Sequence, residues 1–179
     1  MLMERQWERI APIREIDKGL FFEFECGVTA FDRWLRESAH NAASRGECAA
    51  HVCIDRDGAP VAFFTLSATS INSDVVSNNH RGGMHGPIPA TLLGKMGVRT
   101  DLQGGGCGTC VLHHAMKYAL QSARIVSSRL FVVDALTSDL VSWYEARGLK
   151  KLPGSERRLV CKMSDVETIC NAQMPGYFI

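Results

Sequence analysis

Residues 92–118 read LLGKMGVRTDLQGGGCGTCVLHHAMKY, and the interpretation of the whole chain starts from them. We interpret them as a β-strand, a glycine-rich turn and an α-helix. The run Gly104–Gly108, interrupted only by Cys107, leaves little side chain over the backbone. Backbone N–H groups in such a loop can approach an anion closely, and the positive end of the following helix strengthens the attraction. The stretch therefore predicts a site for a phosphate or pyrophosphate group.

Three other interpretations of this loop fit the sequence less well. A P-loop has Lys and then Ser or Thr after its last glycine, whereas Cys107-Gly108-Thr109 follows here. A dinucleotide-binding loop lies early in a βαβ unit, and Gly104-x-Gly106 does not continue to a third glycine at the required step. Cys107 and Cys110 form a C-x-x-C motif, but no second pair with metal-ligand spacing accompanies it. We therefore predict no metal site.

Length and composition indicate an ordinary globular protein. The chain has 179 residues, 46% of them hydrophobic and 22% charged, which predicts one domain over 1–179, with its core at about 10–163 and a C-terminal tail at 164–179. No signal peptide or membrane span is evident, so we expect a cytoplasmic protein without a membrane partner. The net charge of +1 demands no polyanionic partner, and seven scattered cysteines argue against a disulfide framework.

Hydrophobic periodicity predicts a mixed α/β fold, with strands and helices alternating around the glycine loop. Helices are expected over 30–44, directly after the glycine loop, and over 139–147. Residues 72–88 are expected to form a loop, and 165–179 carry only weak structural signals. The predicted strands span 9–16, 48–55, 60–71, 90–99, 129–135, 149–152 and 158–163.

Single residues sharpen these boundaries. Residues 55–58 (DRDG) predict a hairpin turn. Gly94 and Gly97 inside a strand predict a bulge or a close backbone approach. Ser138 can cap the helix that Gly148 ends. The adjacent residues His113 and His114 point about 100° apart on a helix, so we interpret them as solvated or packing side chains rather than metal ligands. These features describe an anion-binding α/β domain and no more.

A family resemblance adds to this description. Residues 103–108 (QGGGCG) resemble the Q/R-x-x-G-x-G/A loop with which GCN5-related N-acetyltransferases hold the pyrophosphate of acetyl-CoA. The match is closest to the toxin branch, whose members acetylate aminoacyl-tRNA in bacterial toxin–antitoxin pairs. Four further segments in the right order carry it: 24–27 (FECG) with 31–35 (FDRWL), Asn41 with 44–46 (SRG), 87–89 (PIP) with 93–98 (LGKMGV), and 133–135 (VDA) with 143–149 (WYEARGL).

The resemblance implies a splayed sheet and a set of site residues. Acetyl-CoA, as co-substrate, is expected between the strand ending at Val98 and the strand ending at Ala135. Tyr144 is implied as the catalytic residue that protonates the leaving thiolate. No general base is indicated, although Glu47 and His51 are conceivable. The residues implied to bind acetyl-CoA are Met96 and Val98, through their backbone groups, and Gln103, Gly104, Gly105, Gly106, Cys107, Gly108 and Thr109.

The same resemblance implies the partners. They are an aminoacyl-tRNA as substrate, a small antitoxin of the ribbon–helix–helix type, and a second copy of the chain as an open alternative. Two other functions stay open: an acetyltransferase for a small-molecule or protein amine, and a non-catalytic acyl-CoA-binding domain. Candidate tRNA contacts are Arg33, Arg36, Arg45, Arg81, Lys95 and Arg99, with Arg147, Lys150 and Lys151 beyond Tyr144.

Overall fold

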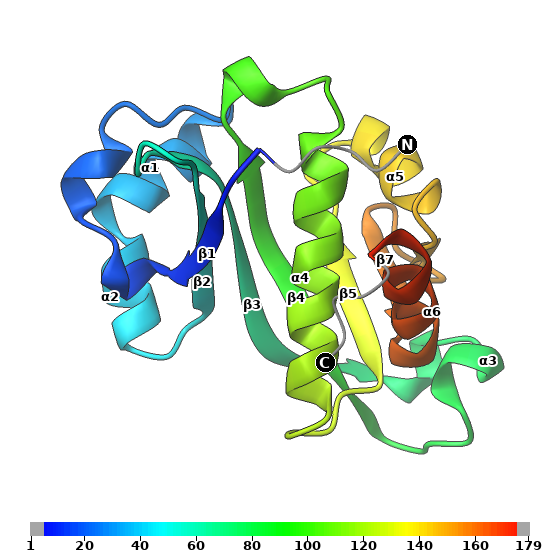
Figure 1. Cartoon of the computed structure of the whole chain (residues 1–179). Helices are drawn as coiled ribbons and strands as arrows, with labels where there is room; N and C mark the ends of the chain where they lie inside the picture. Colours follow the sequence, from blue (N-terminus) through cyan, green and yellow to red (C-terminus); the bar gives the residue numbers. More distant parts are fainter. Residues whose placement is uncertain (1–5, 175–179) are drawn as a thin grey trace. The chain divides into compact units, whose positions relative to one another are not determined.

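The computed structural model describes residues 6–174. The chain divides into two compact units, unit 1 (Met1–Ser67 and Lys95–Ala115) and unit 2 (Ala68–Gly94 and Met116–Ile179). Seven strands form one sheet in the order β1-β2-β3-β4-β5-β7-β6 (Figure 1). The predicted mixed α/β fold is therefore confirmed, whereas the single domain stays a prediction.

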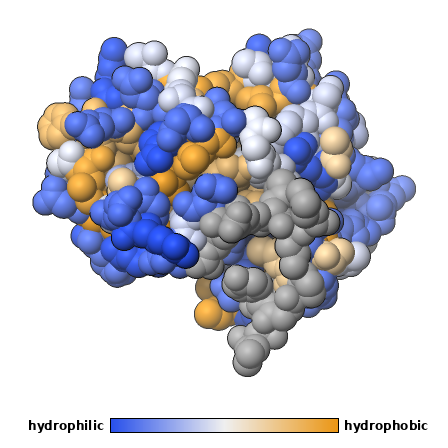
Figure 2. All heavy atoms as spheres, turned by 45° about the horizontal axis from the view of Figure 1, so that its top comes forward, coloured by the Kyte–Doolittle hydropathy of each residue, from blue (hydrophilic) through white to orange (hydrophobic). Residues whose placement is uncertain are grey.

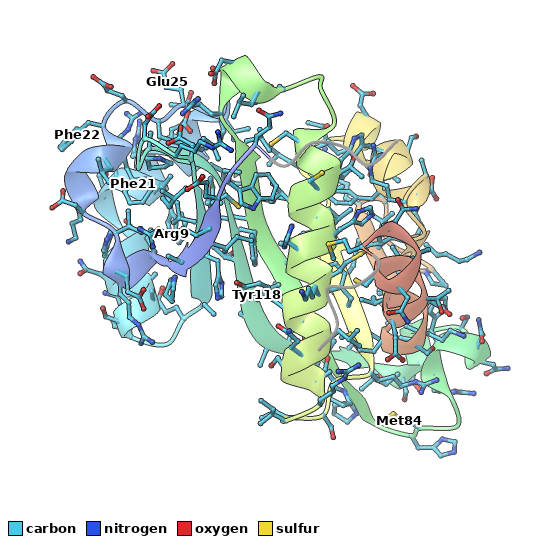
Figure 3. All side chains as sticks on the ribbon, in the orientation of Figure 1. Arg9, Phe21, Phe22, Glu25, Met84 and Tyr118 are labelled. Atoms are coloured by element: carbon cyan, nitrogen blue, oxygen red, sulfur yellow. The ribbon has the colours of Figure 1, made fainter. Side chains whose placement is uncertain are left out.

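Unit 1 contains the N-terminal strands and helices. Strand β2 pairs antiparallel with both β1 and β3, and the hairpin between β2 and β3 turns at Gly58, whose φ is 84°. The apolar face of the pair is covered by the helices, and Phe21 is fully buried there while its neighbour Phe22 is 74% exposed (Figure 3). The elements are β1 (Arg9–Pro12), η1 (Ile13–Glu15), η2 (Lys18–Phe21), α1 (Thr29–Glu37), α2 (Ala39–Ser44), β2 (Ala49–Ile54), β3 (Pro60–Asn72, shared with unit 2) and η4 (Thr100–Leu102).

Two N-terminal predictions need correction. The strand expected over 9–16 stops at Pro12, and a 3₁₀ helix follows, because proline has no N–H to donate to a further strand pair. The helix expected over 30–44 is two helices, since Ser38 has φ −121° and ψ −27°. Leu35 before the break and Ala39 after it are both buried.

Unit 2 contains the C-terminal strands and helices. Strand β5 pairs parallel with β4 and antiparallel with β7, which also pairs with β6. The elements are η3 (Ser73–Val75), α3 (Asn78–Arg81), β4 (Pro87–Val98, which ends in unit 1), α4 (Cys107–Ala123, which begins in unit 1), β5 (Leu130–Asp134), α5 (Ser138–Glu145), β6 (Lys150–Lys151), β7 (Arg158–Lys162) and α6 (Met163–Gln173).

Three predictions for unit 2 also need correction. The segment 165–173 is helical in α6, because Met163, Val166 and Cys170 recur at three- and four-residue steps and are all buried. Residues 175–179 lie outside the described residues. The loop expected over 72–88 contains the short helices η3 and α3. Ser138 is the first residue of α5 rather than its cap.

Strand β4 has the close approach that was predicted at Gly97, whereas the role of Gly94 stays a prediction. A Cβ on Gly97 would lie 2.6 Å from Phe63 Cε1 and 3.1 Å from Cys26 Sγ, so only glycine fits this close approach. The pairing of β4 with β5 runs from Ala90↔Leu130 to Leu93↔Val133, and β4 then continues to Val98. The residues of β4 after Leu93 thus lie beyond the segment that pairs with β5.

In the described residues, no helix has the length and apolar character needed to cross a membrane. On the face that Figure 2 shows, apolar residues lie in separate patches among hydrophilic ones.

Candidate active site

The glycine loop in unit 1 has the backbone geometry that its sequence predicts. Gly104 and Gly106 have φ values of 80° and 85°, a region that other residues rarely adopt. Helix α4 begins directly afterwards, with Thr109 N and Cys110 N donating to Gly106 O. Within the part of the chain that the structure describes, the N–H groups of Gly104–Gly108 make no hydrogen bond. These successive donors at a helix N-terminus can be satisfied by an anion.

Gly105 gives a further indication of a ligand. Its φ lies outside the left-handed region, and no atom lies within 4 Å of a Cβ built on it, so the fold itself does not require glycine there. A ligand that must approach the backbone closely does require it. The open space beside the backbone at Gly105 leaves room for a ligand such as a pyrophosphate.

The Gln103 side chain anchors the glycine loop through two hydrogen bonds. Its Nε2 donates to Cys26 O and to Val98 O, both at 2.8 Å, and so connects the segment before α1 with the end of β4. Cys26 is held in turn, because its N–H donates to the buried Asp32 carboxylate at 2.9 Å. Sequence reasoning gave Gln103 a role in binding the ligand and did not consider Asp32. The signal was available, since an acidic residue in the first turn of a helix often accepts a backbone N–H.

The C-x-x-C pair is not a reactive site in this structure. Cys107 is buried, and burial raises the pKa of its thiol to about 11. Burial also raises the pKa of Cys110. Both thiols are therefore protonated at neutral pH, and no group of residues suited to a metal ion occurs among residues 6–174.

Tyr144 lies on α5 in unit 2 and is 6% exposed. Burial raises the pKa of its phenol to about 12, although the nearby Arg147 charge lowers it in part. Arg147 itself lies 3.7 Å above the Trp143 ring and donates to Trp143 O. Among the described residues, the Tyr144 hydroxyl makes no hydrogen bond. A protonated phenol without a protein partner is a hydrogen-bond donor that remains available to a substrate.

The end of β4 carries the other predicted cofactor contacts. Val98 is buried, and its carbonyl already accepts from Gln103, whereas Met96 is partly exposed. Lys95 N donates to the buried Thr65 hydroxyl at 2.9 Å. The ammonium group of Lys95 lies 4.7 Å from the centre of the Trp34 ring. This Thr65 contact was not predicted.

The arginines predicted to contact tRNA in unit 1 lie among carboxylates. Arg36 donates to Phe21 O and Phe24 O and thus connects α1 with the segment that precedes it. Arg45 pairs with Glu47. A hollow of about 350 Å³ has the two arginines Arg33 and Arg36 and three carboxylates, a formal charge of −1. The residues that line it are Glu25, Gly27, Thr29, Asp32, Arg33, Arg36 and Glu37.

Arg99 is neutralised in a similar way. Its guanidinium pairs with Asp101 at 2.7 Å and lies 3.8 Å from Asp55, and the Asp101 bond raises the pKa of Arg99 above its ordinary value. The larger hollow that Arg99 lines, about 910 Å³, again holds three carboxylates and two arginines. Four of the predicted tRNA contacts lie in unit 2, namely Arg81, Arg147, Lys150 and Lys151.

Comparisons with known proteins show which solved structures share this fold. No family model matches the chain. The structure is similar to a tyrosine-to-phenylalanine mutant of KacT (TM-score 0.81, 19% identity, 90% of this chain and 98% of that one). It is equally similar to AtaT complexed with acetyl-methionyl-tRNAfMet (TM-score 0.81, 20% identity, 90% and 98%). The chain therefore shares the fold of KacT and AtaT.

A similarity in sequence to a curated protein accompanies the similarity in fold. The chain is 28% identical over 160 residues to the tRNA-acetylating toxin of Mycobacterium tuberculosis (strain ATCC 25618 / H37Rv), covering 89% of this chain and 95% of that protein.

Proposed function

We propose that the protein transfers an acetyl group from acetyl-CoA to the α-amine of an aminoacyl-tRNA, and thereby blocks translation as the toxin of a toxin–antitoxin pair. The observation that carries the proposal is the row of N–H groups at Gly104–Gly108, at the start of α4, which find no acceptor among residues 6–174. The similarity to a tRNA-acetylating toxin supports the choice of acceptor. A solved structure of AtaTR bound with acetyl-CoA supports the choice of donor.

The residues divide the work as follows. Backbone N–H groups from Gly104 to Gly108 bind the pyrophosphate, and Gln103 holds that loop in place. The Thr109 N–H, which was predicted to join them, donates to Gly106 O instead. Backbone groups of Met96 and Val98 bind the pantetheine arm. Acetyl-CoA supplies the activated thioester, and Tyr144 donates a hydrogen bond to the sulfur as the bond to the acetyl carbon breaks. The solved AtaT and KacT structures that are tyrosine-to-phenylalanine mutants support a role for a tyrosine.

Energetics favour hydrogen bonding by Tyr144 over full proton transfer. The phenol pKa of about 12 exceeds that of a thiol, about 8.5, by 3 to 4 units. Complete transfer from the phenol to the thiolate is therefore uphill by roughly 5 kcal/mol. A hydrogen bond to the charge that develops on sulfur avoids most of this cost and still stabilises the transition state.

The proposal includes an antitoxin partner. AtaT has been solved bound to the C-terminus of the antitoxin AtaR, and KacTA has been solved in complex with DNA. We infer a small antitoxin of the ribbon–helix–helix type for this chain, and action in the cytoplasm, where charged tRNA is available. A homodimer stays an open alternative.

An acetylation assay with a full set of charged tRNAs tests the proposal. We expect acetyl transfer to the α-amine of at least one aminoacyl-tRNA, and growth arrest on expression in cells. Transfer to free amines or peptides, with none to any charged tRNA, would instead identify a small-molecule or protein acetyltransferase. Binding of acetyl-CoA without turnover on any acceptor would identify a non-catalytic acyl-CoA-binding domain.

The rate is expected to depend on pH through the substrate rather than through Tyr144. An α-amine has a pKa of about 8, so kcat/KM rises up to about pH 8 and then levels off. Burial raises the pKa of Tyr144 to about 12, so its phenol keeps its proton throughout the range from pH 6 to pH 9. A pH–rate profile checks this point. A descending limb that begins below pH 9 and disappears in Tyr144→Phe would contradict it.

A further inference from the structure

Positive side chains gather around α3 in unit 2. Arg81 is the last residue of this helix. Arg129 Nε donates to His80 O at 2.6 Å, and Lys162 Nζ donates to Asn79 Oδ1 at 3.1 Å. Figure 1 shows α3 close to the start of α6, where Lys162 ends β7, and Figure 3 shows Met84 on the loop that follows α3.

Strand register adds Lys150 to the same side of the sheet. Lys150 pairs with Val160, and Lys162 pairs with Leu130. Side chains alternate between the two faces along a strand, so Lys150, Val160 and Lys162 share one face. Val160 and Leu130 belong to the buried cluster that also contains residues of the α3 segment, such as Val76. We call Arg81, Arg129, Lys150 and Lys162 together the α3 surface.

The pKa of the buried His80 reflects the positive charges around it. Burial is the largest cause that lowers its pKa, and the charges of Lys162, Lys150 and Arg129 lower it further, against an opposing effect of Asp165. Three separate cations thus lie close enough to act on one imidazole, which agrees with their placement by hydrogen bonds and register.

Charge balance distinguishes the α3 surface from the arginines of unit 1. Arg81 and Arg129 donate to neutral oxygens, those of Asn78, His80 and Asn79. Among the described residues, Lys150 forms no ion pair, and Lys162 lies 3.7 Å from the half-exposed Asp165. The surface therefore keeps an excess of positive charge, whereas both hollows of unit 1 have a formal charge of −1.

We propose that the α3 surface binds the sugar–phosphate backbone of the tRNA substrate. This inference rests on the proposed function. Lysine and arginine side chains without carboxylate partners release counterions when they contact phosphates, and this supplies most of the affinity for a nucleic acid. Such contacts position the substrate without reading its sequence. Of the contacts that the sequence suggested, Arg81 and Lys150 of unit 2 then hold the tRNA body, whereas the arginines next to α1 do not.

A pair of matched charge reversals tests the proposal. The variant Arg81→Glu/Lys150→Glu changes the α3 surface, and Arg14→Glu/Lys18→Glu makes the same change of charge at exposed positions of unit 1. We expect the first variant to bind tRNA at least 10-fold more weakly by fluorescence anisotropy, with a salt slope reduced by about 2. We expect wild-type kcat/KM on an aminoacyl-adenosine acceptor, which lacks the tRNA body. The control should bind tRNA as wild type does.

Each outcome has one meaning. Equal tRNA affinity in the α3 variant and the control would overturn the proposal and leave the proposed function intact. Lys150→Glu alone, at an exposed strand position, gives a second measurement if the double variant does not fold, and it should weaken tRNA binding severalfold. Wild-type protein that binds tRNA through this surface but acetylates no charged tRNA would contradict the proposed function alone.

Discussion

Replacing Tyr144 with phenylalanine is expected to lower kcat for acetyl transfer on the order of 100-fold, the usual loss when a positioned proton donor is removed. The phenol keeps its proton at neutral pH because burial raises its pKa to about 12, and no protein group takes its hydrogen bond in the described residues. Its loss should therefore leave acetyl-CoA affinity and thermal stability nearly unchanged. Steady-state kinetics, calorimetry with acetyl-CoA and thermal unfolding check the three expectations.

Tyr118→Phe is the matched control, since it removes the same atom from a partly exposed tyrosine of α4. It should retain wild-type turnover. In cells, expression of Tyr144→Phe should permit growth where the wild type arrests it. Wild-type kcat in purified Tyr144→Phe would exclude the phenol from the chemistry, and a loss confined to acetyl-CoA affinity would make it a binding residue instead.

Placing a carboxylate in the glycine loop is expected to have the second large effect. In Gly105→Asp, a negative charge would lie next to the N–H groups that are proposed to hold the pyrophosphate. Repulsion of roughly 2–3 kcal/mol between charges a few ångströms apart weakens acetyl-CoA binding by about 30- to 100-fold. Folding should be little affected, because Gly105 has no positive φ and open space around its Cβ position. Calorimetry with acetyl-CoA measures the change.

Gly105→Asn separates charge from size, because asparagine has the shape of aspartate without its charge. It should bind acetyl-CoA more tightly than Gly105→Asp and more weakly than the wild type. Equal affinities in all three proteins would remove the loop from the binding site. Melting temperatures of the variants show whether the fold has been preserved.

The sequence predicted the fold class and the glycine loop well, because both depend on short-range patterns. The hairpin at Gly58, the helix after the loop and the close approach at Gly97 were all confirmed. Helix α6 was missed although its apolar spacing was visible, because its few apolar residues are separated by polar ones. The break at Ser38 had no local signal, because no glycine or proline lies near that position.

In the candidate site, too, the sequence determined the local features and the tertiary structure determined the rest. The sequence by itself determined the row of backbone donors at Gly104–Gly108, because successive glycines and the start of a helix fix N–H groups locally. Only the tertiary structure decided which cations stay uncompensated, because charges meet through contacts between distant residues: Arg99 with Asp55, or Arg129 with His80, 49 positions away. Backbone geometry depends on neighbouring residues in the chain. Whether a cation has a carboxylate partner depends on which distant residues the fold brings together.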